Sequence, residues 1–198
     1  MNTGQVTFRL LNIYRKQAFD MTRQNGFTIL ELMTTLAVAA ILASVAVPGL
    51  QSITANSRQS GSVNELVSAI HLARNSAVTR NTRITVCASS NGQTCEAVDW
   101  NEGWIVFDDP DDDQTVDAAE TVLNSGANFE NLTISSPEFA NAFTYRANGR
   151  LTNAAAGTIV GQFNLCDHRG AGYAKVLVVE ISGRPRIAEH GEIAAVCP

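Results

Sequence analysis

The sequence has few of the residues from which catalytic sites are usually built. Its 198 residues include three histidines, His71, His168 and His190, which are scattered along the chain. It has no G-x-S-x-G motif, no H-E-x-x-H motif and no glycine-rich phosphate loop, the local patterns that position a nucleophile, a zinc ion or a phosphate. His168 follows Asp167 directly, and such a pair is more typical of a turn than of a catalytic dyad. We therefore expect no enzymatic activity.

Positive charge is also scarce, with 14 Lys and Arg against 19 Asp and Glu, a net charge of -5. A chain with 45% apolar residues and so small a net charge is expected to fold. Its acidic balance excludes binding to nucleic acid or anionic lipid through bulk charge, so any such contact must come from a local patch. The charge is uneven, because residues 1–26 carry +3 and residues 27–198 carry -8.

Charge is almost absent from one long apolar run. Between Phe27 and Leu50 the only ionisable residue is Glu31. A run of this length matches the roughly 20 residues that a helix needs to cross a membrane. Basic residues precede the run and an acidic, cysteine-containing body follows it, so the positive-inside rule places the N-terminus in the cytoplasm and the body outside.

The sequence suggests a cleavage site before this apolar run. In an ordinary secretory signal the cleavage site follows the apolar stretch. Gly26 is followed by F-T-I-L-E-L-M, and this segment resembles the class III signal of type IV pilins and type II secretion pseudopilins. The resemblance implies that prepilin peptidase removes the leader 1–26 by cleaving before Phe27, whose new amine is then methylated. Residues 27–50 would remain as a transmembrane and filament-core helix. Glu31 would pair with the N-terminal amine of a neighbouring subunit, which compensates a carboxylate that is costly in apolar surroundings.

Residues 51–80 are expected to continue the helix as an amphipathic half that rests on the body. Pro48 and Gly49 should kink or locally unwind it, because proline lacks a backbone donor and clashes with the preceding turn. A helix from residue 27 to about 79 would be the long spine that pilin-like proteins share. The apolar residues at helical spacing are Val63, Leu66, Val67, Ile70, Ala73 and Ala77.

Residues 81–198 are expected to form a β-rich globular domain, because short β-type runs alternate with turn residues. The fold class is α+β, with an antiparallel sheet or small sandwich resting on the helix. The runs are Ile84–Ala88, Gly103–Phe107, Leu132–Ser135, Phe143–Arg146, Thr158–Cys166, Lys175–Ile181 and Arg184–Ala188.

Several stretches of this domain and of the helix end resemble the group of minor pilins and pseudopilins that contains FimT, FimU and GspH. They are A-R-N-S-A at 73–77, T-V-C at 85–87, G-W-I-V-F at 103–107, F-T-Y-R-A-N-G-R at 143–150 and S-G-R-P-R at 182–186.

Four cysteines, Cys87, Cys95, Cys166 and Cys197, form an even set without a C-x-x-C pair. In an oxidising compartment this favours two disulfides over metal ligands, with free packed thiols as the alternative. The sequence does not choose among the three connectivities. We favour Cys87 with Cys95, which closes a short loop, and Cys166 with Cys197, which ties down the C-terminus.

An aspartate cluster offers the ligand spacing of a twelve-residue calcium loop. Asp109 would be position 1, and the other carboxylates, Asp111, Asp113, Asp117 and Glu120, would occupy positions 3, 5, 9 and 12. Gln114 stands where such loops need glycine, and Pro110 is unusual at position 2. The alternative is an exposed acidic loop without a cation.

The tetrapeptide G-R-P-R contains Arg184 and Arg186, and it resembles the G-R-x-R element of FimT-type pilins that is implicated in binding DNA during transformation. In an extended strand the two side chains share one face, about 7 Å apart, and can contact successive phosphates. The proline indicates an edge strand. Lys175 and Arg150 could extend the patch if the fold brings them close. The alternative is a pair of structural arginines, since three glutamates are near in sequence.

Together these features predict a minor type IV pilin that is processed at the inner membrane. It would assemble with other pilins into an extracellular pilus, helping to initiate or cap it, with DNA as a further partner. The alternative is a GspH-like minor pseudopilin of a type II secretion system. No cofactor is required, and calcium is the one candidate ligand.

Overall fold

The computed structural model describes residues 26–126, 128–152, 161–189 and 191–197. The chain divides into two compact units, Met1–Gly49 and Leu50–Pro198. The helix α2, Ile29–Arg80, begins in the first unit and ends in the second. Among the described residues α2 is the one helix long and apolar enough to cross a membrane, with a mean hydropathy of 2.1 over a window that has no buried residue.

The helix passes through Pro48, where the sequence predicts a kink or local unwinding. Local unwinding is absent, because α2 is assigned as helix without a break from Ile29 to Arg80. Proline removes one backbone hydrogen bond, and the bonds retained on either side are enough to keep the helical backbone.

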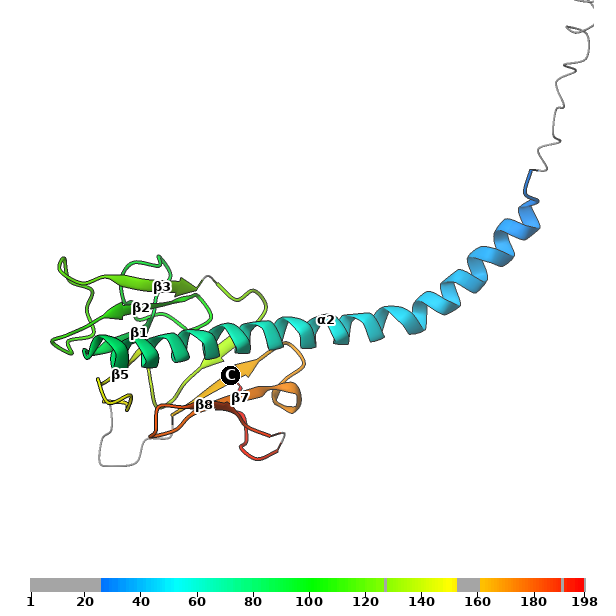
Figure 1. Cartoon of the computed structure of the whole chain (residues 1–198). Helices are drawn as coiled ribbons and strands as arrows, with labels where there is room; N and C mark the ends of the chain where they lie inside the picture. The colour runs from blue at the N-terminus through cyan, green and yellow to red at the C-terminus, as the bar shows by residue number, and fades with distance from the viewer. Residues whose placement is uncertain (1–25, 127, 153–160, 190, 198) are drawn as a thin grey trace, which may run out of the picture. The chain divides into compact units, whose positions relative to one another are not determined.

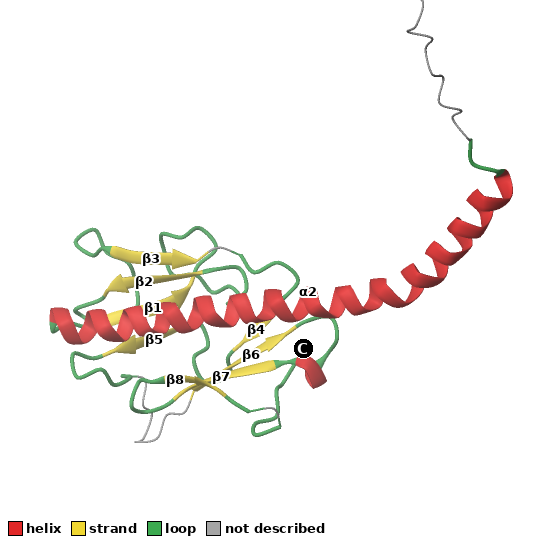
Figure 2. Ribbon diagram, turned by 45° about the vertical axis from the view of Figure 1, so that its right-hand side comes forward, coloured by secondary structure: helices red, strands yellow, loops and turns green. Residues whose placement is uncertain are grey.

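In the second unit α2 buries an apolar stripe, as its periodicity predicts. The buried residues recur every three or four positions, which places them on one face of the helix. They are Gln59, Val63, Leu66, Ala69, Ile70, Ala73 and Ala77. This part of α2 lies across the strands in Figure 1 and Figure 2, and it shares one core cluster with them.

Two antiparallel four-stranded sheets complete this unit, which confirms the α+β class. The first sheet has the order β3-β2-β1-β5 and the second the order β4-β6-β7-β8. A short 3₁₀ turn, η2 (Ala171–Tyr173), precedes β7. The strands are β1 (Ile84–Ala88), β2 (Trp104–Asp108), β3 (Val122–Gly126), β4 (Thr133–Ser135), β5 (Ala142–Tyr145), β6 (Gly161–Cys166), β7 (Lys175–Val179) and β8 (Pro185–Ile187).

Each of the seven β-type runs read from the sequence overlaps a strand, and β1 has the predicted bounds. The first residues of the run Thr158–Cys166 lie outside the described residues. β3 is not among the predicted runs. Its sequence, V-L-N-S-G, ends in residues typical of turns, and it is a strand because it pairs with β2.

The main core is aromatic where the two sheets meet. Phe139 lies 4.6 Å from Phe143 and 5.3 Å from Phe163 between ring centroids. A Cβ at Gly161 would overlap the ring of Phe139, so only glycine fits there. A second, smaller cluster lies on the outer face of the first sheet and comprises Cys87, Ile105 and Phe107, with Cys95, Val116, Val122 and Ala142 packed against it.

Candidate functional site

The N-terminal motif is built around the start of α2. Thr28 precedes the helix, and its Oγ1 accepts the Glu31 N–H at 3.2 Å while its carbonyl oxygen accepts the Leu32 N–H at 3.1 Å. Thr28 is therefore the N-cap, and Glu31 lies in the first turn, where a carboxylate interacts favourably with the helix dipole. Gly26 and Phe27 lie outside the helix, and Phe27 is 83% exposed.

Hydroxyl groups along this half of α2 are satisfied by the helix itself. The side chains of Thr34, Thr35 and Ser44 each donate to the carbonyl oxygen three residues earlier, at 3.0, 2.9 and 2.7 Å. A helix in apolar surroundings needs such internal bonds, because no water is present to replace them. Glu31 has the only ionisable side chain between Phe27 and Leu50, so its charge is the one that an apolar environment must compensate from outside.

The predicted arginine pair lies at an edge of the second sheet, since β8 is the last strand in its order. Arg186 is engaged by two carboxylates: its Nε donates to Glu180 at 3.2 Å, and Nη1 and Nη2 donate to Glu192 at 2.9 and 2.7 Å. These bonds lower the pKa of Glu192. Arg184 precedes the strand and is exposed. Of this pair, the Arg186 guanidinium is thus occupied by carboxylates, and the Arg184 guanidinium has no partner among the described residues and is available to an anion.

Three of the stretches named above meet near Arg184. Arg74 on α2 donates from Nε to the Ser182 carbonyl oxygen at 3.3 Å, and the Tyr145 hydroxyl at the end of β5 donates to the Gly183 carbonyl oxygen at 3.0 Å. Gly183 has φ of +74°, and a Cβ there would overlap the Gly149 carbonyl oxygen. We call this contact between α2, β5 and the β7–β8 turn the motif junction.

The motif junction brings together some of the predicted basic residues and not others. Arg150 directly follows Gly149, whose carbonyl oxygen lies against Gly183. Lys175 lies at the other end of β7, where its Nζ donates to the Ser60 Oγ at 2.7 Å. Gly149, the residue before Arg150, thus lies beside both Gly183 and the Arg74 side chain, while Lys175 does not extend the patch. Burial raises the pKa of Tyr145, with a smaller opposing effect from Arg74, so its phenol stays a donor.

In the acidic loop, Asp109 has a structural task. Its side chain is fully buried, and Oδ1 accepts the backbone N–H groups of Asp112 and Asp113 at 2.8 and 3.2 Å. Oδ2 accepts the Gln114 N–H at 3.2 Å and the Thr85 hydroxyl. Four donors use the hydrogen-bonding capacity of this carboxylate, which folds the loop over the outer face of the first sheet.

The other four predicted calcium ligands lie close together. Ligand oxygens of Asp111, Asp113 and Asp117 are within 4.8 Å of one another, as are those of Asp109, Asp111 and Glu120. The aspartates of the first set are exposed. The Glu120 Oε2 accepts the Asp117 N–H at 3.0 Å. Partial burial raises the pKa of Glu120, and the charges of the neighbouring aspartates raise it further, against a smaller lowering by the hydrogen bond from Asp117.

Two disulfides are present, Cys87–Cys95 and Cys166–Cys197, the pairs favoured from the sequence. The first holds the loop after β1 over the smaller cluster, and the second holds the C-terminal segment to β6.

Some residues of these sites are not singled out by sequence reasoning. The T-x-x-E spacing of Thr28 and Glu31 is a capping signal that could identify the helix start. Tyr145 carries no local signal for its role, because its partner is 38 residues away in sequence. Glu192 is one of the three glutamates near the arginine pair, and its contact with Arg186 agrees with the alternative of a structural arginine at that position.

Comparison with known proteins gives two family matches. The family described as Type II transport protein GspH matches residues 62–183, and the prokaryotic N-terminal methylation motif matches residues 21–47. Two fimbrial proteins of Pseudomonas aeruginosa are 39% identical to this chain over 69 residues, which is 35% of this chain and 44% of theirs. The chain thus spans less than half the length of these curated relatives.

Two crystal structures of the type IV minor pilin FimU of Pseudomonas aeruginosa strain PAO1 are similar in fold. The first has a TM-score of 0.53 and 20% identity, and it covers 70% of this chain and 93% of that chain. The second has a TM-score of 0.50 and 21% identity, covering 66% of this chain and 93% of that chain. At these identities the likeness concerns the fold alone.

Proposed function

We propose that the chain is a minor type IV pilin which is processed before Phe27 and built into a pilus. The chain belongs to the GspH family of minor pilins and pseudopilins, whose model matches residues 62–183. The observation that carries the proposal is the position of the N-terminal motif. The methylation motif spans residues 21–47, and within it the helix begins at Ile29, directly after the expected cleavage site. A processed chain would therefore start two residues before a capped apolar helix.

The surface of this helix half requires a partner. Its large apolar side chains are exposed, with Phe27, Ile29 and Val45 at 83, 80 and 75%. Such an area is stable in lipid or against other apolar helices and not in water. We infer that the chain is held in the inner membrane until other pilins replace the lipid, with the globular unit on the periplasmic side.

Glu31 fits the assembled state, in which other pilins surround the helix. Its carboxylate needs a cationic partner in an apolar surrounding, and the methylated amine of Phe27 on a neighbouring subunit would supply one. This contact would favour insertion of a subunit next to a chain that is already in place.

Mass spectrometry of the protein extracted from pili tests the proposal. The expected chain begins at N-methylated Phe27, and a Gly26→Val variant should keep the leader and be absent from pili. Assembled protein that still carries Met1 would refute the proposal.

The alternative is a GspH-like minor pseudopilin of a type II secretion system, the class in the family's description. The identity to fimbrial proteins supports the pilus. Deletion in the native host distinguishes the two, because loss of surface pili with normal protein secretion supports the pilin, whereas the reverse supports the pseudopilin.

DNA capture is a second candidate function, and we centre it on the motif junction instead of the Arg184–Arg186 pair. Arg74 donates to Ser182, two residues before Arg184, and Gly149, the residue before Arg150, lies against Gly183, whereas Arg186 already holds two carboxylates. Phosphate contacts of this kind are weak for one subunit, insensitive to base sequence and lowered by salt.

Titration of the detergent-solubilised full chain with short duplex DNA at low salt tests this candidate. Arg184→Gln should weaken binding several-fold. The control Arg58→Gln removes the same charge from an exposed position on α2 and should leave binding unchanged. Equal binding by the wild type and Arg184→Gln would place the contact elsewhere, and no binding at millimolar duplex would exclude it.

Calcium binding is a third candidate, favoured by the close carboxylates of Asp111, Asp113 and Asp117. Oxygen ligands of this type suit calcium, which would relieve their mutual repulsion. Asp109 does not fit the predicted role of first ligand in full, because four donors already occupy its oxygens. Calcium should raise the melting temperature of the wild type and not that of Asp111→Asn/Asp117→Asn. An unchanged melting temperature of the wild type would identify the segment as an acidic loop.

A further inference from the structure

The last described residues of the chain, Gly191–Cys197, lie against the outer face of the second sheet. Three contacts on this face hold them: Glu192 binds Arg186 on β8, the Val196 N–H donates to the Asn164 Oδ1 at 3.4 Å, and Cys197 is bonded to Cys166. Asn164 and Cys166 are two residues apart on β6 and thus project to the same face. We call residues 191–197 the C-terminal cover.

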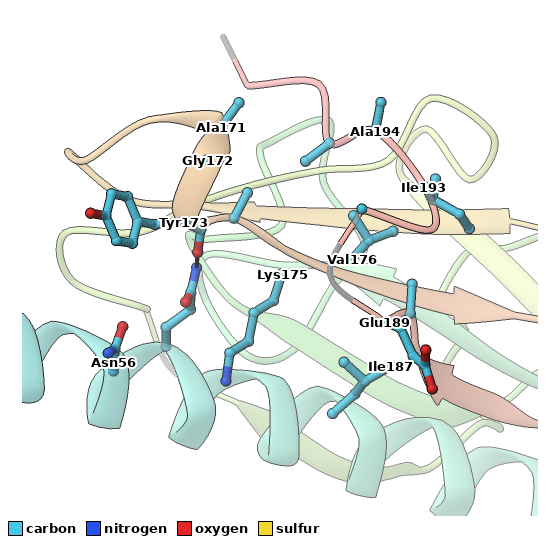
Figure 3. A pocket seen from close by; sticks show the side chains of 15 residues that line it. Asn56, Ala171, Gly172, Tyr173, Lys175, Val176, Ile187, Glu189, Ile193 and Ala194 are labelled. Atoms are coloured by element: carbon cyan, nitrogen blue, oxygen red, sulfur yellow. Dashed lines mark hydrogen bonds between the residues drawn. The ribbon is translucent and has the colours of Figure 1, made fainter.

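Residues beneath the C-terminal cover are buried although they are not part of the central core. Asn164 is 0% exposed and Val176 is 5% exposed. Asn164 is the cross-strand partner of Val176, so both project to this face. Val176 also lines a cavity of about 730 Å³ together with Ile193 and Ala194 of the cover (Figure 3). The cover is therefore part of the wall that separates this face from solvent.

The non-covalent contacts of the cover are weak. The Arg186–Glu192 pair is exposed, with 42 and 38% of the two side chains accessible, and surface ion pairs of this kind add little to stability. The hydrogen bond to Asn164 is long, and the Asn164 Nδ2 is buried without a hydrogen-bond partner among the described residues. A buried donor without a partner disfavours the closed arrangement. The disulfide is the contact that keeps the cover closed.

We propose that the C-terminal cover is a redox-controlled element, closed when Cys166 and Cys197 are bonded and open when a dithiol reduces them. Cys197 is half-buried and Cys166 is 4% exposed, so the attacking thiolate reaches the Cys197 sulfur. That attack forms a mixed disulfide and releases Cys166 as a thiolate, which takes a proton. The second thiol of the reductant then displaces Cys197, so two electrons and two protons pass to the protein and the dithiol becomes a cyclic disulfide.

Opening changes the chemistry of this face. It exposes the apolar side chain of Val176 together with the side-chain amide of Asn164, and it removes Glu192 from Arg186. A chain whose globular unit has just reached an oxidising compartment would therefore show an apolar face until the second disulfide forms. The device concerns the maturation of the globular unit and does not depend on whether the chain joins a pilus or a secretion system.

Hydrogen exchange of the detergent-solubilised full chain, read by mass spectrometry, tests the proposal. Cys197→Ser should speed exchange about tenfold or more in peptides covering 175–179 and 191–197 and leave β1 unchanged. The matched control is Cys95→Ser, which removes the other disulfide at its half-buried end and should leave these peptides protected.

Wild-type chain treated with dithiothreitol and then reoxidised is a second arm that needs no variant to fold. Reduction should deprotect the same peptides, and reoxidation should restore them. Unchanged exchange of residues 191–197 after reduction would overturn the proposal. An equal rise across both sheets would also overturn it, because the disulfide would then support the whole unit and not a separate cover.

Discussion

Asp109 is the residue whose substitution tests the energetics of the acidic loop most directly. Its fully buried carboxylate accepts three backbone N–H groups and the Thr85 hydroxyl. An asparagine fills the same volume but replaces one oxygen with an NH₂ group. That group faces the Gln114 N–H, which loses its acceptor, and the Thr85 hydroxyl, which must turn to accept from it, so two of the four contacts to the charged carboxylate are lost or weakened.

The expected loss is set by these two contacts. A hydrogen bond to a charged group contributes about 1.5 to 3 kcal/mol, so losing both contacts outright would cost about 3 to 6 kcal/mol. Gln114 is half-buried, so its N–H can partly rehydrate, and the Thr85 hydroxyl keeps its contact with Thr144 at 2.6 Å. We therefore expect Asp109→Asn to destabilise the globular unit by about 3 kcal/mol, or roughly 6 to 12 °C in melting temperature.

Thermal unfolding of the detergent-solubilised chain, followed by near-ultraviolet circular dichroism in a chelator, measures this loss. Asp117→Asn is the control, because Asp117 is exposed and the substitution removes the same charge from the same loop. It should change stability by less than about 0.5 kcal/mol. Equal melting temperatures for the two variants would refute the reasoning, and a loss that is seen only with calcium present would assign Asp109 to a cation instead.

Three further changes have defined outcomes. Glu31→Ala should leave cleavage intact but lower incorporation into pili, measured by immunoblot of sheared pili, and normal incorporation would contradict the subunit pairing. Gly183→Ala should destabilise the chain by about 2 kcal/mol or more, because its φ is +74° and a Cβ would meet a backbone oxygen. Gly172→Ala is the control, because a Cβ there has open space. Equal thermal stability of the two variants would contradict the packing of the motif junction. Arg186 lowers the pKa of Glu192 below its ordinary value of 4.5, so this contact contributes fully above pH 4.5 and is lost as the pH falls through the lowered pKa. Nuclear magnetic resonance titration of the Glu192 carboxyl carbon checks the sign, and a midpoint above 4.5 would contradict it.

Most strands could be predicted from sequence because their physical cause is local. β1 and β2 are runs of β-branched and aromatic residues bounded by polar turns, which is the pattern that favours extended backbone. β3 could not be predicted, because its cause is a neighbour. Its last residue, Gly126, leaves room for the ring of Trp104 on β2, and a Cβ at that position would overlap the ring. A glycine that reads locally as a turn is required here by packing.

The candidate sites divide in the same way. The helix start at Thr28 is local and follows from the T-x-x-E spacing. The role of Asp109 was not visible, because a calcium loop and a self-bonded loop use the same acidic spacing and differ only in where the carboxylate points. The motif junction joins Arg74, Tyr145 and Gly183, which are 38 or more residues apart, so only the fold reveals it.

The G-R-P-R segment shows why a short motif resemblance does not by itself establish a ligand. Gly183 is explained by its positive φ and its approach to Gly149, and Arg186 is explained by the two glutamates that it binds. Pro185 begins an edge strand, where a missing backbone donor is tolerated. The Arg184 carbonyl oxygen accepts the Glu180 N–H at 3.2 Å, and among the described residues its side chain has no hydrogen-bond partner. Its exposed guanidinium is the one group of the motif that the fold does not require, so a function beyond the fold must be sought at Arg184.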